Sequence, residues 1–355
     1  MNVDEIYELA VWVDREVSGK GVPQAYAALQ AILQTNADSG SAAQPFEAER
    51  QAVIDAVRSV SLASLSAEQR EILANERIAQ HLGENGVQEV EEILVRNQLD
   101  IATAAQRFGT IVADFNRAVT HFQALESSLN GFVKRRSVES EGVLMRVVFT
   151  AEASINDVVD LKEWSEKWWR IARGVALANG NAVEDVKVAS ASHGSIIIEL
   201  LLFAGLANVF LTLMNKALEG TEKILNIRLK LDEIRKLDIK EPSIEELLAN
   251  AIKKARAEKI EEIAKALVDA EVLPKKLTAD NRNTLVSSIS ELVGFLEKGG
   301  EVDFVLPASA GEPDDEPGGQ APVLAELQKK LTDQRALQER ILALEARVQH
   351  LGEEA

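Results

Sequence analysis

The residue types that most often perform chemistry in proteins are few in this chain and far apart. Its four histidines, His81, His121, His193 and His350, fall in four different segments, and the chain contains no cysteine. A protein-bound zinc ion needs several histidine, cysteine or carboxylate ligands, often at short spacings such as HExxH. The sequence has no such spacing, so we expect neither a metal site nor a cofactor.

Two short motifs resemble catalytic or binding loops. His193 stands directly before the Gly-Ser pair 194–195, but a turn residue with unusual backbone dihedrals explains this position better than a catalytic base does. Residues 19–21 (GKG) are glycine-rich like a phosphate loop, yet they lack the GxxxxGK[ST] spacing and a preceding strand. No grouping of nucleophile, base and electrophile emerges, and we do not expect an enzyme.

The tryptophans are more informative than the histidines. Three of the four lie in one predicted helix, as Trp164, Trp168 and Trp169. Trp168 shares an apolar helix face with Leu161 and Val175, so we expect it to anchor the core. Trp169 departs from that face, which predicts an exposed aromatic contact for a partner.

Residues 323–352 form the clearest interaction element of the sequence. Apolar residues recur there at steps of three and four, with a stammer before Leu337, and predict a coiled-coil helix. The seam consists of Leu324, Leu327, Leu331, Leu337, Ile341, Leu344, Val348 and Leu351. Residues 307–322 are rich in proline, glycine and acids and predict a disordered linker. Because a seam on such a tether has no core to face, we expect it to pair with a second copy, giving a homo-oligomer, or with a partner protein.

Two regions must position these residues. Residues 1–132 have apolar spacing near 3.6 and predict a helical N-terminal domain. Residues 143–306 predict an α+β domain with strands at 143–150, 186–191, 195–202 and 301–306. Their order with the helices indicates a split β-α-β-β-α-β sheet of the ferredoxin-like kind, with a helical insertion at about 220–275. The expected fold class is mainly α with a small α+β domain.

Composition limits the function classes. Hydrophobic residues make up 46% and charged residues 27% of the 355 positions, which is typical of a globular chain of about two domains. The net charge of −18 would repel a phosphate backbone, so we expect no nucleic-acid partner. The lack of cysteine and the acidic first residues, MNVDEIYELA, favour a bacterial-type cytoplasmic protein without a signal peptide.

The most apolar stretch, residues 196–214, has two interpretations. Its composition would allow insertion into a membrane. A polar stripe along one helix side argues for a buried, one-sided helix instead. The stripe consists of Asn208, Thr212, Asn215, Glu219, Glu222 and Asn226. Glu199 would fall on the apolar side of one long helix, so we predict a strand ending near Leu202 and a helix from Phe203, with a membrane segment as the alternative.

Four motifs resemble a group of uncharacterised bacterial proteins. They are WSEKWWRIARGVA, VEDVKV and HGSIIIEL within residues 164–202, and the GGEVDF ending within residues 299–306. The resemblance covers roughly the central half of the chain and implies the same α+β domain, but it assigns no activity to any residue. Domains that look related occur beside signalling or conflict modules in bacteria.

These features together predict a non-catalytic scaffold or adaptor that acts by self-association and partner recruitment, in a bacterial signalling or conflict system. The interaction residues are the C-terminal seam and Trp169. The alternative is a membrane-acting effector that inserts residues 196–214 on activation.

Overall fold

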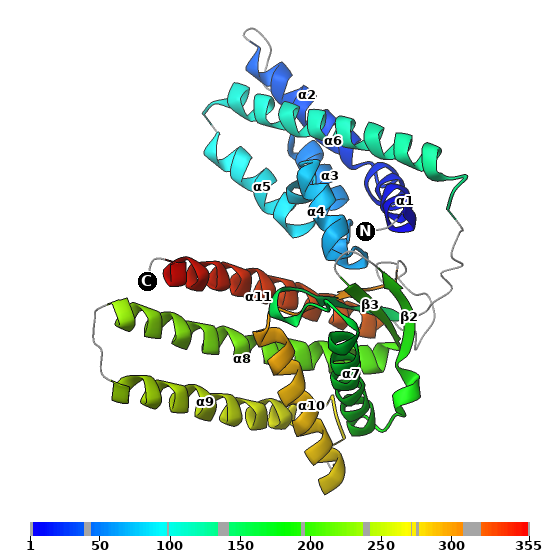
Figure 1. The fold of residues 1–355 in the computed structure, drawn as a ribbon. Coiled ribbons are helices and arrows are strands. Elements are labelled where there is room, and N and C mark those ends of the chain that lie inside the picture. Colours follow the sequence, from blue (N-terminus) through cyan, green and yellow to red (C-terminus); the bar gives the residue numbers. More distant parts are fainter. Residues whose placement is uncertain are drawn as a thin grey trace. The chain divides into compact units, whose positions relative to one another are not determined.

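The computed structural model divides into two compact units, Met1–Val138 and Glu139–Ala355. It describes residues 3–38, 44–97, 99–133, 142–192, 196–236, 242–270, 272–274, 277–307 and 321–353. Only the backbone is described at residues 192, 228, 231–236, 242–249, 251–252, 255, 321–322 and 348–353. The described residues are mainly helical, and the second unit adds one small sheet (Figure 1). The expected class, mainly α with a small β part, is confirmed.

The first unit consists of helices joined by short turns. They are α1 (Val3–Trp12), which continues into the π-helical η1 (Val13–Ser18), α2 (Val22–Ala37), α3 (Glu47–Arg58), α4 (Ala67–Asn75), α5 (Gly83–Arg96) and α6 (Ile101–Leu129), with short 3-10 turns η2 (Leu62–Ser64) and η3 (Ala79–His81). The segment 19–21 falls where η1 ends and α2 begins, so it is a turn between two helices. The described residues of this region are mainly helical, as their apolar spacing near 3.6 predicted.

Helix α6 has 29 residues and packs along α2 in the first unit. Phe108, Phe115 and Phe122 recur every seven residues and therefore share its buried face. The ring of Tyr26 from α2 stacks on Phe115 with 5.4 Å between centroids. The Tyr26 hydroxyl donates to the carbonyl of His81 at 3.1 Å, and burial raises the pKa of Tyr26 well above its ordinary value. These contacts form the centre of a helical core.

All the strands found among the described residues lie in the second unit. Its elements are β1 (Val143–Phe149), η4 (Ala151–Ala153), α7 (Val158–Ala178), η5 (Val183–Asp185), β2 (Lys187–Ser192), β3 (Ile196–Leu202), α8 (Ala204–Lys236), α9 (Pro242–Asp269), α10 (Ala279–Glu297), β4 (Glu301–Val305) and α11 (Ala321–Glu353). The four strands lie within about a residue of their predicted bounds. β-branched residues mark β1, β3 and β4, whereas β2 contains only Val188. They form one sheet in the order β2-β3-β1-β4, and all neighbours are antiparallel.

Aromatic side chains join α7 and α10 to one face of the sheet. Phe295 of α10 makes edge contacts with Phe149 of β1 and with Trp164 and Trp168 of α7, at centroid distances of 5.4, 5.2 and 5.2 Å. A Cβ atom at Gly300 would lie 2.3 Å from the Phe295 ring, so only glycine fits there. This close approach gives the GGEVDF motif a structural reason.

The start of α7 differs from the expected pattern. Its N-cap is Asp157, whose carboxylate accepts the backbone N–H groups of Val159 and Asp160 at 2.7 and 2.9 Å. Leu161, which was expected on the buried face with Trp168, is 40% exposed, and Trp164 occupies the core instead. The helix therefore begins with its apolar side chains pointing away from the sheet.

The apolar stretch 196–214 is not one helix. Ile196–Leu202 is strand β3, and α8 begins at Ala204, so the predicted division is confirmed. Buried residues surround the first turns of α8, among them Leu206, Phe210 and Leu213. Within the described part of the chain, no helix combines the length and apolarity that a membrane crossing requires.

Helix α11 belongs to the second unit and lies along α8 (Figure 1). The expectation of a helix on a tether with no core to face is therefore wrong. The sequence pattern showed that this helix has an apolar stripe, but it could not show that α8 of the same chain covers the stripe.

Candidate interaction sites

The predicted seam of α11 is largely buried inside the second unit. Leu327 and Leu331 are fully covered, and the other buried seam residues are Leu324, Leu337 and Ile341. Leu344 is half-buried, and the side chains of Val348 and Leu351 lie outside the described residues. Pairing of these residues with a second copy stays a prediction, because in this structure α8 already covers most of them.

The polar stripe of α8 faces α11 and contacts it directly. The Lys330 ammonium donates to Asn208 Oδ1 at 2.7 Å and to Thr212 Oγ1 at 3.0 Å. Asn215 Nδ2 donates to the Lys330 carbonyl at 3.0 Å. Another contact lies two turns further along α8. Arg340 pairs there with Glu222 at 3.0 Å. Four residues of the predicted stripe thus contact α11. The other two bind within α8 itself, because Glu219 pairs with Lys216 and Asn226 donates to the Glu222 carbonyl.

Lys330 is the centre of this recognition. Besides its two α8 partners, its ammonium lies 2.7 Å from Glu326 Oε1, one turn earlier on α11. The hydrogen bond and the charge of Lys330 lower the pKa of Glu326 from its ordinary value. A lysine that satisfies three acceptors at once fixes both the register and the rotation of α11 on α8.

Helix α11 also covers the edge of the sheet at β4. Gln334 and Gln338 donate their side-chain amides to the carbonyl of Val302, at 2.5 and 2.8 Å. The Arg335 guanidinium donates to the Phe304 carbonyl at 3.0 Å. Outward backbone groups of an edge strand attract other strands unless they are covered. Side chains of α11 perform this function at β4, and at the other edge β2 has a register shift between Val188 and Ser190.

A row of charged side chains crosses the sheet from α11 to β2. Arg335 Nε lies 3.2 Å from Asp303 Oδ1, and Asp303 stands directly opposite Arg146 in the strand register. Arg146 is also opposite Glu199, with 3.4 Å from Nε to Oε1, and the Ser190 hydroxyl donates to Glu199. Buried charges require partners of opposite sign. The alternation explains how Glu199 is accommodated inside this apolar segment.

The outer face of α7 carries an exposed apolar patch. Val158, Leu161 and Trp169, hereafter the α7 patch, are 79%, 40% and 53% exposed. At 100° per residue they fall within about 80° of the helix circumference. The Arg173 guanidinium lies 5.4 Å from the centroid of the Trp169 ring and restricts its orientation. Trp164 and Trp168 are buried, so only Trp169 of this group is available to another molecule.

Two histidines of the first unit pair with glutamates. His81 is buried, and its Nδ1 lies 2.5 Å from Glu89 Oε2 while its ring lies 6.0 Å from that of Phe115. This pair is part of the helical core. Among the described residues, no three His, Cys, Asp or Glu side chains are placed to hold a metal ion.

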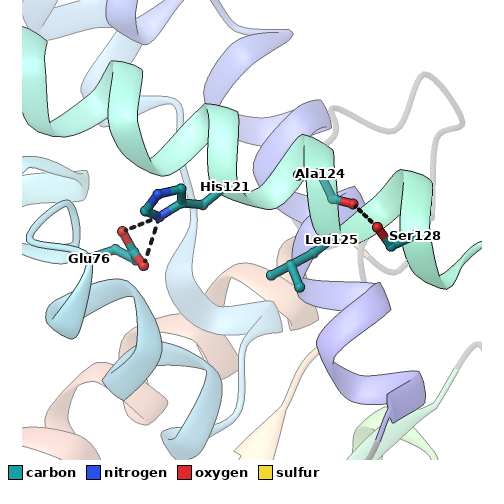
Figure 2. Close-up of a pocket in the computed structure, with 5 residues that line it drawn as sticks. All are labelled: Glu76, His121, Ala124, Leu125 and Ser128. Carbon is teal, nitrogen blue, oxygen red and sulfur yellow. Dashed lines mark hydrogen bonds and ion pairs between the residues drawn. The ribbon is translucent and has the colours of Figure 1, made fainter.

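The second pair lines a surface hollow formed by Glu76, His121, Ala124, Leu125 and Ser128 (Figure 2). His121 Nδ1 lies 3.3 Å from both carboxylate oxygens of Glu76. The Ser128 hydroxyl donates to the Ala124 carbonyl at 2.7 Å, and Figure 2 shows it two turns away from the imidazole. The hydroxyl is thus bound to its own helix and forms no relay with His121. The segment 193–195 and the side chain of His350 lie outside the described residues.

Sequence reasoning missed the polar half of the α11 contact. Lys330, Gln334, Arg335 and Gln338 all bind α8 or β4, although the predicted seam contained only apolar residues. One signal was visible, since Gln334 occupies the stammer in the apolar repeat. A buried glutamine at a seam position indicates a specific hydrogen-bond partner.

Comparison with protein-family models, curated proteins and solved structures gives no match.

Proposed function

We propose that the protein is a non-catalytic cytoplasmic scaffold or adaptor that binds other protein chains, its own copies among them. The observation that supports this proposal is the α7 patch. Soluble surfaces seldom gather large apolar side chains without a partner to cover them. Tryptophan is among the residues that contribute most to protein interfaces, and a ring held by Arg173 loses little freedom on binding.

The sheet supports a more specific fold proposal. A split β-α-β-β-α-β sheet places its strands in the order 4-1-3-2 with antiparallel neighbours, and the observed pairings follow this order. We infer a ferredoxin-like domain in which α8, α9 and α10 stand in the place of the second helix. Such a domain leaves α7 on an outer layer, where its free side is available to a partner.

Sedimentation of the full chain tests the proposed function. The double variant Val158→Gln and Trp169→Gln removes the apolar patch but keeps helix-forming, uncharged residues. We expect the unchanged chain to associate reversibly as its concentration rises through the micromolar range, and the variant to keep a mass near the 38.7 kDa of one chain over that range. Val95→Gln is the matched control, because Val95 is also an exposed apolar helix residue but lies in the first unit.

Two results would contradict the proposal. One is a mass of a single chain at every concentration for the unchanged protein. The other is an equal loss of association in the Val95→Gln control, which would show that the α7 patch has no particular role. Circular dichroism of each variant distinguishes a lost contact from a lost fold.

A further inference from the structure

The side of α8 under α11 is chemically unlike the opposite side. The side facing α11 carries Asn208 and Thr212, which accept hydrogen bonds from the Lys330 ammonium. It also carries Asn215, which donates to the Lys330 backbone carbonyl. At 100° per residue, Leu206, Phe210 and Leu213 fall on the other side of the helix. Besides α11, α8 packs on α7, α10 and β1. The apolar side of α8 thus keeps its cover when α11 leaves, and the side that becomes exposed carries a polar stripe.

The contacts of α11 resemble those of a separable partner more than those of a core helix. Lys330, Arg335 and Arg340 each form an ion pair or charge-assisted hydrogen bond with α8 or β4 in which water can replace the protein partner. Gln334 and Gln338 bind backbone carbonyls in the same way. Interfaces between separable chains combine an apolar centre with such polar contacts.

The connection to the rest of the chain leaves the choice of docking site open. Strand β4 ends at Val305 and α11 begins at Ala321. The stretch 306–320 between them can span up to about 50 Å when extended. That reach allows α11 to dock on its own α8 or on the α8 of a neighbouring molecule.

We propose that α11 exchanges between copies, so that the surface formed by α8 and β4 of one molecule accepts α11 of another. No new contact is required, because every hydrogen bond and ion pair of the docked helix is the same in both arrangements. This inference rests on the proposed scaffold function, for which it supplies one mode of self-association. The partner is a second copy of this chain.

Concentration decides between the two arrangements. The composition of residues 307–322 predicts a flexible linker. A flexible linker of this length would hold α11 near its own α8 at an effective concentration of about 1 mM, so dilute molecules keep their own helix. When the local concentration of copies approaches this effective concentration, docking of α11 on the α8 of a neighbour competes with docking on the α8 of its own chain. Exchange then links molecules that a partner has already brought together.

The absence of cysteine makes a direct test possible. Glu222→Cys places one thiol on α8, and Arg340→Cys places one on α11 in a second chain, at the positions of an observed ion pair. The two chains are mixed, refolded together from denaturant at about 10 µM or about 1 mM, and joined with a short bis-maleimide. Refolding removes any dependence on the rate at which α11 leaves α8.

The expected result is a product that joins the two different chains. At the higher concentration it should exceed the products of like chains about tenfold, and it should fall on refolding at the lower concentration. The double variant Glu222→Cys/Arg340→Cys is the control for docking, and at low concentration it should be joined within one chain. A mixed product no more abundant than the like-chain products at about 1 mM, with the control joined internally, would overturn the exchange.

Two further measurements distinguish failure of the docked geometry from association through the α7 patch. A double variant that is not joined internally would contradict the docked geometry itself, and the inference with it. Adding Val158→Gln and Trp169→Gln to both single-thiol chains should leave the mixed product unchanged. Loss of the mixed product in that background would mean that α7 contacts cause it, which counts against exchange of α11.

Discussion

At the scale of single residues, the buried charges define how α11 and the sheet fit together. Arg335 and Asp303 have side chains only 11% and 8% exposed, and both are held in a row that continues to Arg146 and Glu199. A buried ion pair adds less stability than an apolar pair of the same shape, but breaking it leaves a charge without a partner. The row therefore contributes mainly to the correct alignment of α11 and the four strands.

Removal of one partner of this pair should be costly. We expect Arg335→Ala to lower the free energy of unfolding by about 3 kcal/mol, because the buried Asp303 carboxylate loses the Arg335 guanidinium and keeps Arg146 opposite it in the strand register. Urea unfolding followed by circular dichroism measures the change. The double variant Arg335→Met/Asp303→Asn should recover part of the loss. A loss below about 1 kcal/mol for Arg335→Ala would show that the pair is solvated in solution.

The Glu326 carboxylate on α11 makes the stability of the fold depend on pH. Its pKa is lowered in the folded chain, so its ionised form stabilises the fold above its unfolded pKa of about 4.5. That contribution disappears as the pH falls through the lowered pKa. Glu326→Gln should therefore lose less stability between pH 6 and pH 3 than the unchanged chain does.

Urea midpoints at the two pH values measure this difference, with Glu339→Gln on the same helix as the control. Glu339 is exposed, and it has no part in the contact with α8 described above. An identical acid response of the Glu326→Gln variant and the unchanged chain would contradict the role of the Lys330 contact.

At the scale of elements, α11 is a folded part of the second unit. Leu327 is fully buried and Leu342, on the same helix, is 51% exposed. We expect Leu327→Ala to lower the free energy of unfolding by about 2 to 5 kcal/mol, since it leaves a cavity against α8. Leu342→Ala should change it by less than about 0.5 kcal/mol.

The two leucine variants have the same chemistry and the same helix propensity, so their difference measures burial alone. Chemical denaturation of the full chain provides both values. Equal effects of the two substitutions would mean that α11 is not docked on α8 in solution.

Much of this element structure could be predicted from the sequence, and the reasons are local. β-branched residues marked three of the four strands, and Glu199 separated β3 from α8 inside one apolar stretch. The polar stripe of α8 and the apolar stripe of α11 were both visible. Their contact was not, because periodicity shows that a helix has two sides but not which distant segment covers each of them. Asn208 and Lys330 meet across more than a hundred residues.

Of the candidate sites, one could be predicted from local sequence and another could not. The departure of Trp169 from the α7 face was a local signal, and the structure leaves that side chain half exposed. The row from Arg335 to Ser190 depends on strand register and on the docking of α11, which only the folded chain brings together.

At the scale of the whole molecule, the burial of residues 196–214 bears on the membrane alternative. The segment supplies a central strand and the core turns of α8, so inserting it would require the second unit to unfold. We expect the folded chain not to float with vesicles of neutral or anionic lipid at neutral pH. Flotation without loss of near-ultraviolet circular dichroism would contradict this expectation and favour a membrane-acting protein.

The sheet also determines the order in which the chain becomes able to fold during synthesis. β1 lies between β3 and β4, and its Val147 is paired with Val302 of β4. The ribosome must therefore add more than 150 residues after Val147 before that pair can form. The first unit has its complete core much earlier. A nascent second unit thus carries an unfinished sheet for most of its translation, which is the period when chaperones that bind nascent chains would have the greatest effect on its yield.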